Sequence, residues 1–397
     1  MLYVVVIEVQ IGPFFIEGAF SCNVVGVSTV RLQNSPHMKK FAALFLLAIS
    51  ACKKDHQDPD PGLQPLIDNG PAEIAFISRR IPNSADWQLF LMNSDGNHQR
   101  LISDRIVKCT PVTGSHNGRK IAFNTYENGQ NNLYVMDKAN GSTTLIGSHD
   151  DYISSAVWSP DDTKILFVKL DDRRAQVLTY SIFIIDADGR NEKALVTGIS
   201  AGSPQWFPDG KTIGFIGVEN GKAGVYSIQP DGSGTKRLSP ADQSFGGFSI
   251  SPTGKQMVLV SNSQDGSQLF LMNANGGSTK QVTTSVSPRV WPGWARDGNH
   301  SPVWSPDGTK IAYVSWANGS PDIFIMDANG KNDKRLTNSP MRDENPEWSR
   351  DGKYIYFSSN RDMSVSSEIY RMTPDGKAQT PLTKWIGDDI YPVILKQ

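Results

Sequence analysis

The side chains in this sequence that could carry chemistry are carboxylates and histidines in short clusters. The clusters are spread along the chain and comprise Asp104, His149-Asp150-Asp151, Asp242, Asp297, His300, Asp343-Glu344 and Asp388-Asp389. Carboxylates that gather in one place attract a cation or the cationic group of a partner, and imidazoles beside them hold divalent metals. What these residues do therefore depends on whether the fold brings them together.

Two other patterns look chemical but have a simpler explanation. Gly198-Ile199-Ser200-Ala201-Gly202 has the spacing of a nucleophile elbow, which requires a strand before it, a helix after it and an α/β sheet around it. The surrounding sequence does not have those patterns, so we predict no catalytic residue. The cysteines Cys22, Cys52 and Cys109 are far apart and odd in number, which indicates neither a disulfide framework nor a paired-cysteine metal site.

A turn followed by an apolar strand repeats throughout the chain. In Trp304 to Tyr313, Ser-Pro-Asp-Gly favours a type I turn, in which Pro306 presets φ and Gly308 suits the last position. The strand after this turn has counterparts that begin at Ile74, Ile121, Ile165, Ile213, Met257 and Ile355. The aspartates and glycines recur because the turn requires them, so we interpret them as structural.

Each unit continues with a second hairpin and holds about four strands. Periods of roughly 40 to 50 residues with four strands per period are typical of propeller blades. The repeats predict an all-β fold, a seven-bladed β-propeller of four-stranded antiparallel blades, with six blades as the alternative. The first unit, from Ile74, lacks its first strand. We therefore expect the C-terminal stretch from Asp388 to Ile394 to complete that blade and close the ring.

The motif W-S-P-D-G-x-x-I-A-[FY], followed by an I/L-[FY]-x-M-D strand, resembles the Pro-Asp-Gly (WD-like) propeller repeat of the TolB-like family. The resemblance covers about residues 71–397. TolB itself has an N-terminal α/β domain before its propeller, and Cys52 to Gly70 is too short to contain one. The resemblance therefore implies the propeller fold and does not imply TolB's specific partners.

Residues 38–52 have the pattern of a lipoprotein signal peptide. Met38-Lys39-Lys40 is basic, and the apolar Phe41 to Ile49 is too short to span a bilayer. Ser50-Ala51-Cys52 resembles a bacterial lipobox, which implies that Cys52 is lipidated and that the protein is an outer-membrane lipoprotein, facing the periplasm or the cell surface. We interpret residues 1–37 as a disordered, mis-assigned start, 53–70 as a tether and 71–397 as the propeller.

The carboxylates and histidines named above precede the first strands of the repeats, so in a propeller they gather around one mouth of the central channel. There they are candidates for binding a cation or a partner, the alternative being a solvated rim. Trp291 and Trp294, on the longest linker between units, are further candidates for contact with a protein or sugar, unless they pack beneath their own loop.

A competing interpretation is enzymatic. Some polysaccharide lyases that resemble oligogalacturonate lyase use a seven-bladed propeller in which histidines hold a divalent metal. The metal acidifies the carbon beside a uronic acid carboxylate. In this chain His149 and His300 would carry that role.

The balance of charged residues bears on which class of partner this protein binds. The 39 lysines and arginines nearly balance the 40 aspartates and glutamates, and the net charge of −1 gives no indication of nucleic-acid binding. We expect an exported, lipid-anchored binding or scaffold protein, a monomer that contacts an envelope protein or glycan through one face of the ring and touches the membrane only through its lipid. We expect binding rather than catalysis, and no cofactor beyond a divalent cation at the channel mouth.

Overall fold

The computed structural model describes eight segments of the chain. They are residues 74–80, 87–107, 112–171, 178–261, 266–284, 299–362, 366–385 and 387–395. The predicted start, signal peptide and tether (1–37, 38–52 and 53–70) lie outside the described residues. Within the described segments, no helix is long and apolar enough to cross a membrane.

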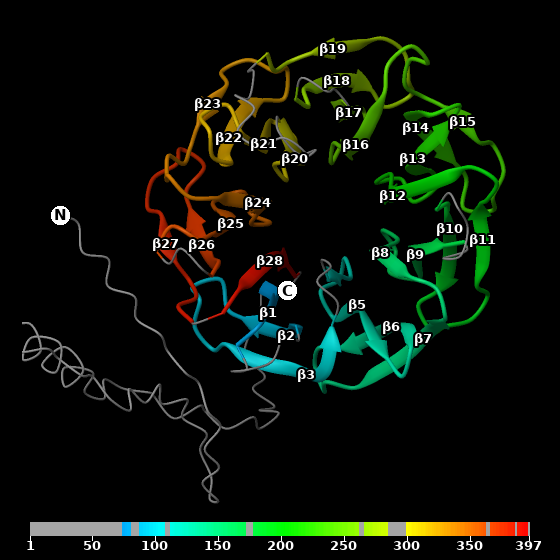
Figure 1. Cartoon of the computed structure of the whole chain (residues 1–397), viewed down its shortest axis with the longest axis horizontal. Coiled ribbons are helices and arrows are strands. Elements are labelled where there is room, and N and C mark those ends of the chain that lie inside the picture. Colours follow the sequence, from blue (N-terminus) through cyan, green and yellow to red (C-terminus); the bar gives the residue numbers. More distant parts are fainter. Residues whose placement is uncertain are drawn as a thin grey trace, which may run out of the picture. The chain divides into compact units, whose positions relative to one another are not determined.

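The strands form seven four-stranded antiparallel blades around a central opening (Figure 1). Blade 1 contains β28 (Asp389–Ile394), β1 (Ile74–Ser78), β2 (Trp87–Met92) and β3 (Arg100–Val107). Blade 2 contains β4 (Thr113–Gly114), β5 (Lys120–Glu127), β6 (Gln130–Asp137) and β7 (Thr143–His149). Blade 3 contains β8 (Ile153–Trp158), β9 (Lys164–Leu170), β10 (Tyr180–Asp186) and β11 (Lys193–Val196).

The remaining four blades have the same order of strands from the channel outward. Blade 4 contains β12 (Ser200–Trp206), β13 (Ile213–Glu219), β14 (Lys222–Ile228) and β15 (Lys236–Arg237). Blade 5 contains β16 (Phe245–Ile250), β17 (Gln256–Ser261), β18 (Leu269–Asn273) and β19 (Thr279–Gln281). Blade 6 contains β20 (Asn299–Trp304), β21 (Lys310–Ser315), β22 (Asp322–Asp327) and β23 (Lys334–Arg335). Blade 7 contains β24 (Asp343–Trp348), β25 (Ile355–Ser359), β26 (Glu368–Met372) and β27 (Thr380–Pro381). The seven-bladed prediction is confirmed, and the six-bladed alternative is wrong.

The central strands of the blades are apolar along most of their length. All five residues of β1 (Ile-Ala-Phe-Ile-Ser) are buried. Because each blade is covered by a neighbour on both faces, its central strands lack the alternation of apolar and polar residues seen in half-exposed sheets. Aromatic pairs add to this packing, as where the rings of Phe215 and Tyr226 stack with centroids 5.5 Å apart. The core is thus a series of layers between blades.

The repeated aspartates serve the turns that contain them. In blade 6 the Ser305 hydroxyl donates a hydrogen bond of 2.6 Å to Asp307, and the Gly308 N–H donates one of 2.8 Å to the Ser305 carbonyl. The Thr309 N–H also donates to Asp307, at 3.0 Å. These hydrogen bonds stabilise the charged carboxylate and so lower the pKa of Asp307, and the bond from Ser305 has the largest effect. The Asp307 carboxylate is therefore occupied within its own turn.

The glycine that ends the turn between the third and fourth strands lies against the preceding blade. A Cβ added to Gly96 would lie 2.7 Å from the carbonyl oxygen of Leu382. One added to Gly376 would lie 2.9 Å from the carbonyl oxygen of Leu336. Both glycines have φ near +85°, at +86° and +84°. Glycine recurs here because the turn needs a left-handed residue and because the preceding blade leaves no room for a side chain.

Two glycines allow these requirements to be separated. Gly96 and Gly129 have similar φ angles, +86° and +83°, but a Cβ on Gly129 would meet nothing within 4 Å. Gly129→Ala should cost about 1–2 kcal/mol for the left-handed backbone alone. Gly96→Ala should cost a further 1–3 kcal/mol or so, because its Cβ collides with the backbone of blade 7. Urea unfolding of both variants measures the difference, and equal losses would show that the contact between blades relaxes freely.

The chain closes the ring with its C-terminal strand. β28 pairs antiparallel with β1, so that Ile74 lies opposite Ile394 and Ser78 opposite Asp389 (Figure 1). The predicted closure is confirmed. The first blade therefore combines strands from the two ends of the propeller.

Five innermost strands share a bulge at which one residue is left-handed. The positive φ angles belong to Ser155, Ser203, Ser301, Asn345 and Tyr391, and the strand register shifts at the same places. Asparagine adopts this conformation more readily than most residues, whereas in a tyrosine it is a clear outlier that costs of the order of 1–3 kcal/mol. Tyr391, with φ of +54°, is therefore the one aromatic residue among these five strained positions.

Candidate functional site

The carboxylates and histidines predicted to share the channel mouth are distributed around the ring. Asp104 belongs to β3, Asp150 and Asp151 lie between β7 and β8, and Asp242 is exposed between β15 and β16. In the described part of the chain, no group of three or more His, Cys, Asp or Glu side chains is placed to hold a metal ion. The candidates Trp291, Trp294 and Asp297 lie outside the described residues.

The two histidines considered as metal ligands belong to different parts of the ring. His149 ends β7 in blade 2, and His300 lies in β20 of blade 6, across the central opening (Figure 1). The His149 ring packs on Phe167 with centroids 5.8 Å apart, and its Nε2 lies 3.3 Å from a Glu192 carboxylate oxygen. Loss of hydration lowers the pKa of His149 despite this carboxylate. His300 Nδ1 instead lies 2.9 Å from the Ser301 hydroxyl.

Two of the candidate aspartates are buried in ion pairs. Asp343 is fully buried, and Arg361 donates hydrogen bonds of 2.8 Å to both of its carboxylate oxygens. Asp389 is fully buried, and Arg80 donates to its two oxygens at 3.1 and 2.6 Å. Their carboxylates face arginines of their own blades, so they fix the ends of the strands.

A further ion pair, Arg79–Asp388, lies beside the Arg80–Asp389 pair where the ring closes. Arg79 donates to the Asp388 carboxylate, and the Arg79 guanidinium lies 4.7 Å from the centre of the Trp87 ring. The Ser367 N–H of blade 7 donates to the other Asp388 oxygen at 3.0 Å. We call the two pairs, Arg79–Asp388 and Arg80–Asp389, the closure pairs, since they hold β28 against the rest of blade 1.

A buried carboxyl group in blade 7 adjoins the closure pairs. Glu368 accepts hydrogen bonds from the Thr383 hydroxyl at 2.6 Å and from the Trp385 N–H at 2.7 Å. Loss of hydration and, to a lesser extent, the charge of Asp389 nevertheless raise the pKa of Glu368 to about 7. The neutral form of Glu368 is thus favoured in the folded protein up to about neutral pH.

This raised pKa predicts a pH dependence of stability. In the unfolded chain glutamate releases its proton near pH 4.3, so between about pH 4.5 and 7 only the folded protein holds a proton on Glu368. Stability from this group is present below that window and is lost as pH rises through it. Urea unfolding at pH 5 and pH 8 should therefore show a loss at pH 8 that is smaller in Glu368→Gln. If Glu368→Gln loses as much stability between pH 5 and pH 8 as the wild type does, the prediction is wrong.

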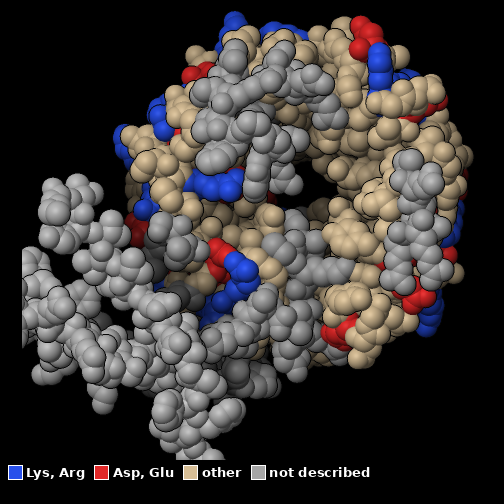
Figure 2. Space-filling model, in the orientation of Figure 1, with Lys and Arg blue, Asp and Glu red and all other residues tan. Residues whose placement is uncertain are grey.

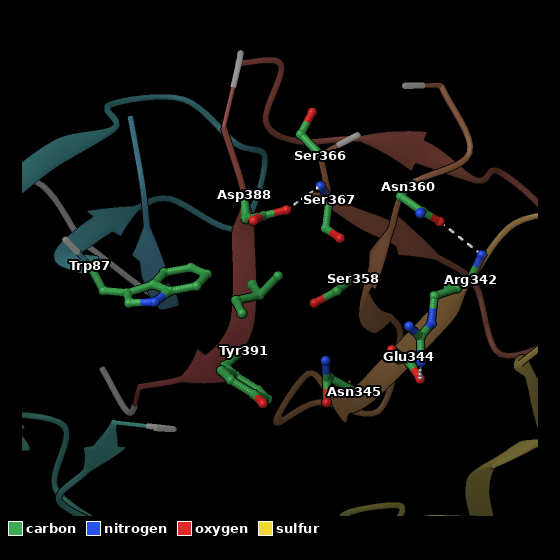
Figure 3. Close-up of a pocket in the computed structure, with 11 residues that line it drawn as sticks. Trp87, Arg342, Glu344, Asn345, Ser358, Asn360, Ser366, Ser367, Asp388 and Tyr391 are labelled. Atoms are coloured by element: carbon green, nitrogen blue, oxygen red, sulfur yellow. Dashed lines mark hydrogen bonds and ion pairs between the residues drawn. The ribbon is translucent and has the colours of Figure 1, made fainter. Parts of the chain in front are cut away.

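A cavity of about 280 Å³ lies between blade 7 and blade 1 (Figure 3). Blade 7 contributes Arg342 and Glu344 at one edge and the neutral polar residues Asn345, Ser358, Asn360 and Ser367. Blade 1 contributes Trp87, Asp388, Ile390 and Tyr391. Of the predicted candidates, the structure brings together Glu344 and Asp388 in this cavity.

Most residues of the cavity were missed by the sequence prediction, although two left a signal. Ser358 stands where the equivalent strands of blades 1 and 6 have Ile77 and Val314. A hydroxyl at a place where those strands have an aliphatic side chain marks a position that packing alone does not set. Tyr391 stands where other innermost strands have Ser203 or Asn345.

The tryptophans that precede the turns connect neighbouring blades. The Trp304 indole N–H donates a hydrogen bond of 3.1 Å to the Ser249 carbonyl of blade 5. The Trp348 indole N–H donates one of 3.3 Å to the Val303 carbonyl of blade 6. Both side chains are buried, so they hold the ring together.

A second cavity, of about 390 Å³, lies beside these turns at the other end of the innermost strands. Glu347 and Arg350 are its charged residues. Loss of hydration raises the pKa of Glu347 to about 7, and Arg350 opposes this shift. On the face shown in Figure 2, basic and acidic side chains lie next to one another rather than in patches of one sign.

Three curated proteins are similar in sequence to parts of this chain. An uncharacterised protein of Agrobacterium fabrum is 28% identical over 196 residues, covering 48% of this chain and 60% of that protein. The Tol-Pal system protein TolB of Francisella tularensis is 25% identical over 214 residues, covering 52% of this chain and 47% of that protein. Dipeptidyl-peptidase 5 of Porphyromonas endodontalis is 24% identical over 260 residues, covering 54% of this chain and 38% of that protein. The aligned part thus spans between 38 and 60% of the length of these relatives.

Solved structures share the fold at low identity. TolB of Acinetobacter baumannii matches 82% of both chains with a TM-score of 0.51 and 19% identity. An oligogalacturonate lyase in complex with manganese covers 78% of this chain and 84% of its own, with a TM-score of 0.55 and 16% identity. At such identities the likeness shows the propeller fold alone. The family model for the TolB β-propeller domain matches residues 71–287 and 296–393, most of the chain. The chain belongs to the TolB β-propeller domain family.

Proposed function

We propose that this protein is a non-enzymatic binding protein of the bacterial cell envelope. It engages an envelope protein or glycan through the face of the ring that carries the loops between blades. The observation that carries this proposal is the cavity between blades 7 and 1, which opens among those loops and is lined by polar groups from both blades. Membership of the TolB family supports a binding role for a propeller of this kind.

The proposal includes export and attachment by a lipid at Cys52, at the outer membrane. The support is the basic, apolar and small-residue pattern of residues 38–52. Labelling cells with radioactive palmitate should mark the protein, and Cys52→Ser should abolish the label and release the protein from the membrane fraction. Sedimentation of that released protein should give the mass of a monomer.

Binding at the cavity can be tested by photo-crosslinking in cells. A photoreactive amino acid at Asn360, which lines the cavity, should crosslink to an envelope component. The same substitution at Asp375, in the exposed turn after β26 and so at the other end of the strands of blade 7, is the matched control. Equal labelling at both positions, or none at Asn360, would contradict the proposal.

The metal-dependent lyase is the less favoured function. His149 and His300 lie in blades 2 and 6, so they do not form one metal site. The Nε2 atom of His149 faces Glu192, and its ring packs on Phe167. Incubation with oligogalacturonate and Mn²⁺ should therefore give no increase in the ultraviolet absorbance of unsaturated uronides. Such an increase, lost in His149→Ala, would restore the enzymatic interpretation.

A further inference from the structure

We propose that the cavity between blades 7 and 1 binds a single neutral sugar residue, at the end or within an envelope glycan. This inference rests on the proposed function, since it identifies the class of ligand that the binding face takes. It is carried by the hydrogen-bonding groups, charges and size of the cavity.

The charged groups of the cavity already have partners. Asp388 receives hydrogen bonds from the Arg79 guanidinium and the Ser367 N–H. Arg342 Nη2 lies 3.2 Å from a Glu344 carboxylate oxygen. No charge in the cavity is left uncompensated by the described residues, so a phosphate or other strongly charged ligand would have to break an existing pair.

One neutral group of the cavity, the Ser358 hydroxyl, is in contrast available for a hydrogen bond to a ligand. Ser358 is only 4% exposed, and its hydroxyl meets no hydrogen-bond partner among the described residues. A buried hydroxyl without a partner is unfavourable, so a ligand that bonds to it gains affinity. The Asn345 amide and the Ser367 hydroxyl lie on the same side of β28 as Ser358 (Figure 3).

Blade 1 contributes an apolar and aromatic side to the same cavity. Trp87, Ile390 and Tyr391 line it, and Tyr391 is held there in a strained left-handed conformation. Strained residues are concentrated at binding sites, where the surrounding structure fixes them. Aromatic rings beside hydroxyl and amide groups suit a ligand with an apolar face and an edge of hydroxyls, which describes a sugar ring.

The size and the groups present argue against other ligands. At about 280 Å³ the cavity is just below the range of roughly 300–1,000 Å³ for small-molecule sites, so one ring fits better than a long segment. A metal ion would require several carboxylates or histidines together, and the described residues contain no such group.

The test is direct binding by the full chain. On an array of neutral oligosaccharides that end in hexose or N-acetylhexosamine, the protein should bind a subset, and calorimetric titration with the strongest of them gives Kd. Ser358→Ala should raise Kd about tenfold, because it removes one hydrogen bond to a buried group. Ser78→Ala is the matched control, since Ser78 is also fully buried with no partner for its hydroxyl among the described residues but lies outside the cavity. Its Kd should not change.

A second variant separates binding from folding. Tyr391→Gly removes the aromatic ring at a backbone conformation that glycine adopts readily, so the protein should remain as stable as wild type while Kd for the sugar rises. If no array glycan binds, or if Ser358→Ala binds as tightly as wild type, the sugar inference is overturned. Crosslinking of a protein from Asn360 would then leave the proposed function standing, whereas failure of both would end it.

Discussion

Deleting residues 388–397 should abolish the cooperative unfolding transition of the propeller. The deletion removes β28, in which the partly buried Ile390 and Val393 pack against the apolar core between blades 1 and 2, and also the buried Leu395. A fully buried aliphatic side chain contributes roughly 1.5–3 kcal/mol and a partly buried one less, so Leu395, Ile390 and Val393 together contribute about 4–7 kcal/mol. That loss is comparable to the entire stability of a typical domain, about 5–15 kcal/mol. Thermal unfolding followed by near-ultraviolet circular dichroism measures it.

The control is a chain that lacks only residues 396 and 397. These two residues follow β28 and Leu395, so their removal should leave the transition in place. If the chain lacking 388–397 unfolds at the wild-type temperature, β28 does not stabilise the ring and the closed arrangement is not required.

Asp389→Ala should destabilise the protein by about 3–5 kcal/mol. The substitution leaves the Arg80 guanidinium, whose side chain is 8% exposed, without its carboxylate. Loss of one partner of a buried pair is costly because the other charge remains unpaired in a poorly solvated site. Arg80 also lies 4.8 Å from the centre of the Phe90 ring and 5.2 Å from that of Trp385, which holds it in place. Urea unfolding at pH 7 measures the loss.

Two further variants identify the cause. The double variant Arg80→Leu/Asp389→Leu should recover much of the lost stability, since it removes both charges and keeps apolar volume. Arg190→Ala breaks an ion pair with Asp188 in which both side chains are mostly exposed, so it should have no measurable effect. If the double variant is as unstable as Asp389→Ala, the loss of stability comes from the changed shape of the side chains and not from the unpaired charge.

The repeated elements of this fold were predictable because each copy faces the same physical demands. Ser305, Asp307 and Gly308 make bonds within one turn, and blades 2 to 7 all need a turn at that place, so the pattern is visible without a structure. The missing first strand of the first unit likewise predicted closure by β28, since an unpaired β1 would leave an open edge.

The cavity was only partly predictable because its residues differ from blade to blade. Asp343 and Glu344 are neighbours and look equivalent in the sequence, yet Asp343 is buried against Arg361 and Glu344 lines the cavity. Side chains alternate along a strand, so a one-residue difference separates the two environments. The bulge at Asn345 then resets this alternation, and nothing in the spacing of charged residues indicates where it falls.

Closure of the ring by its last strand has a consequence for biosynthesis. Arg79 and Asp388 are 309 positions apart in the chain, so at a synthesis rate of about 5–20 residues per second β1 waits roughly 15–60 seconds for its partner. During that time the first blade presents an unpaired strand edge, which favours aggregation. Chaperones that hold unfolded chains should therefore act on this protein until its C-terminus has been made, and their depletion should lower its yield more than that of a propeller whose blades are each built from one continuous segment.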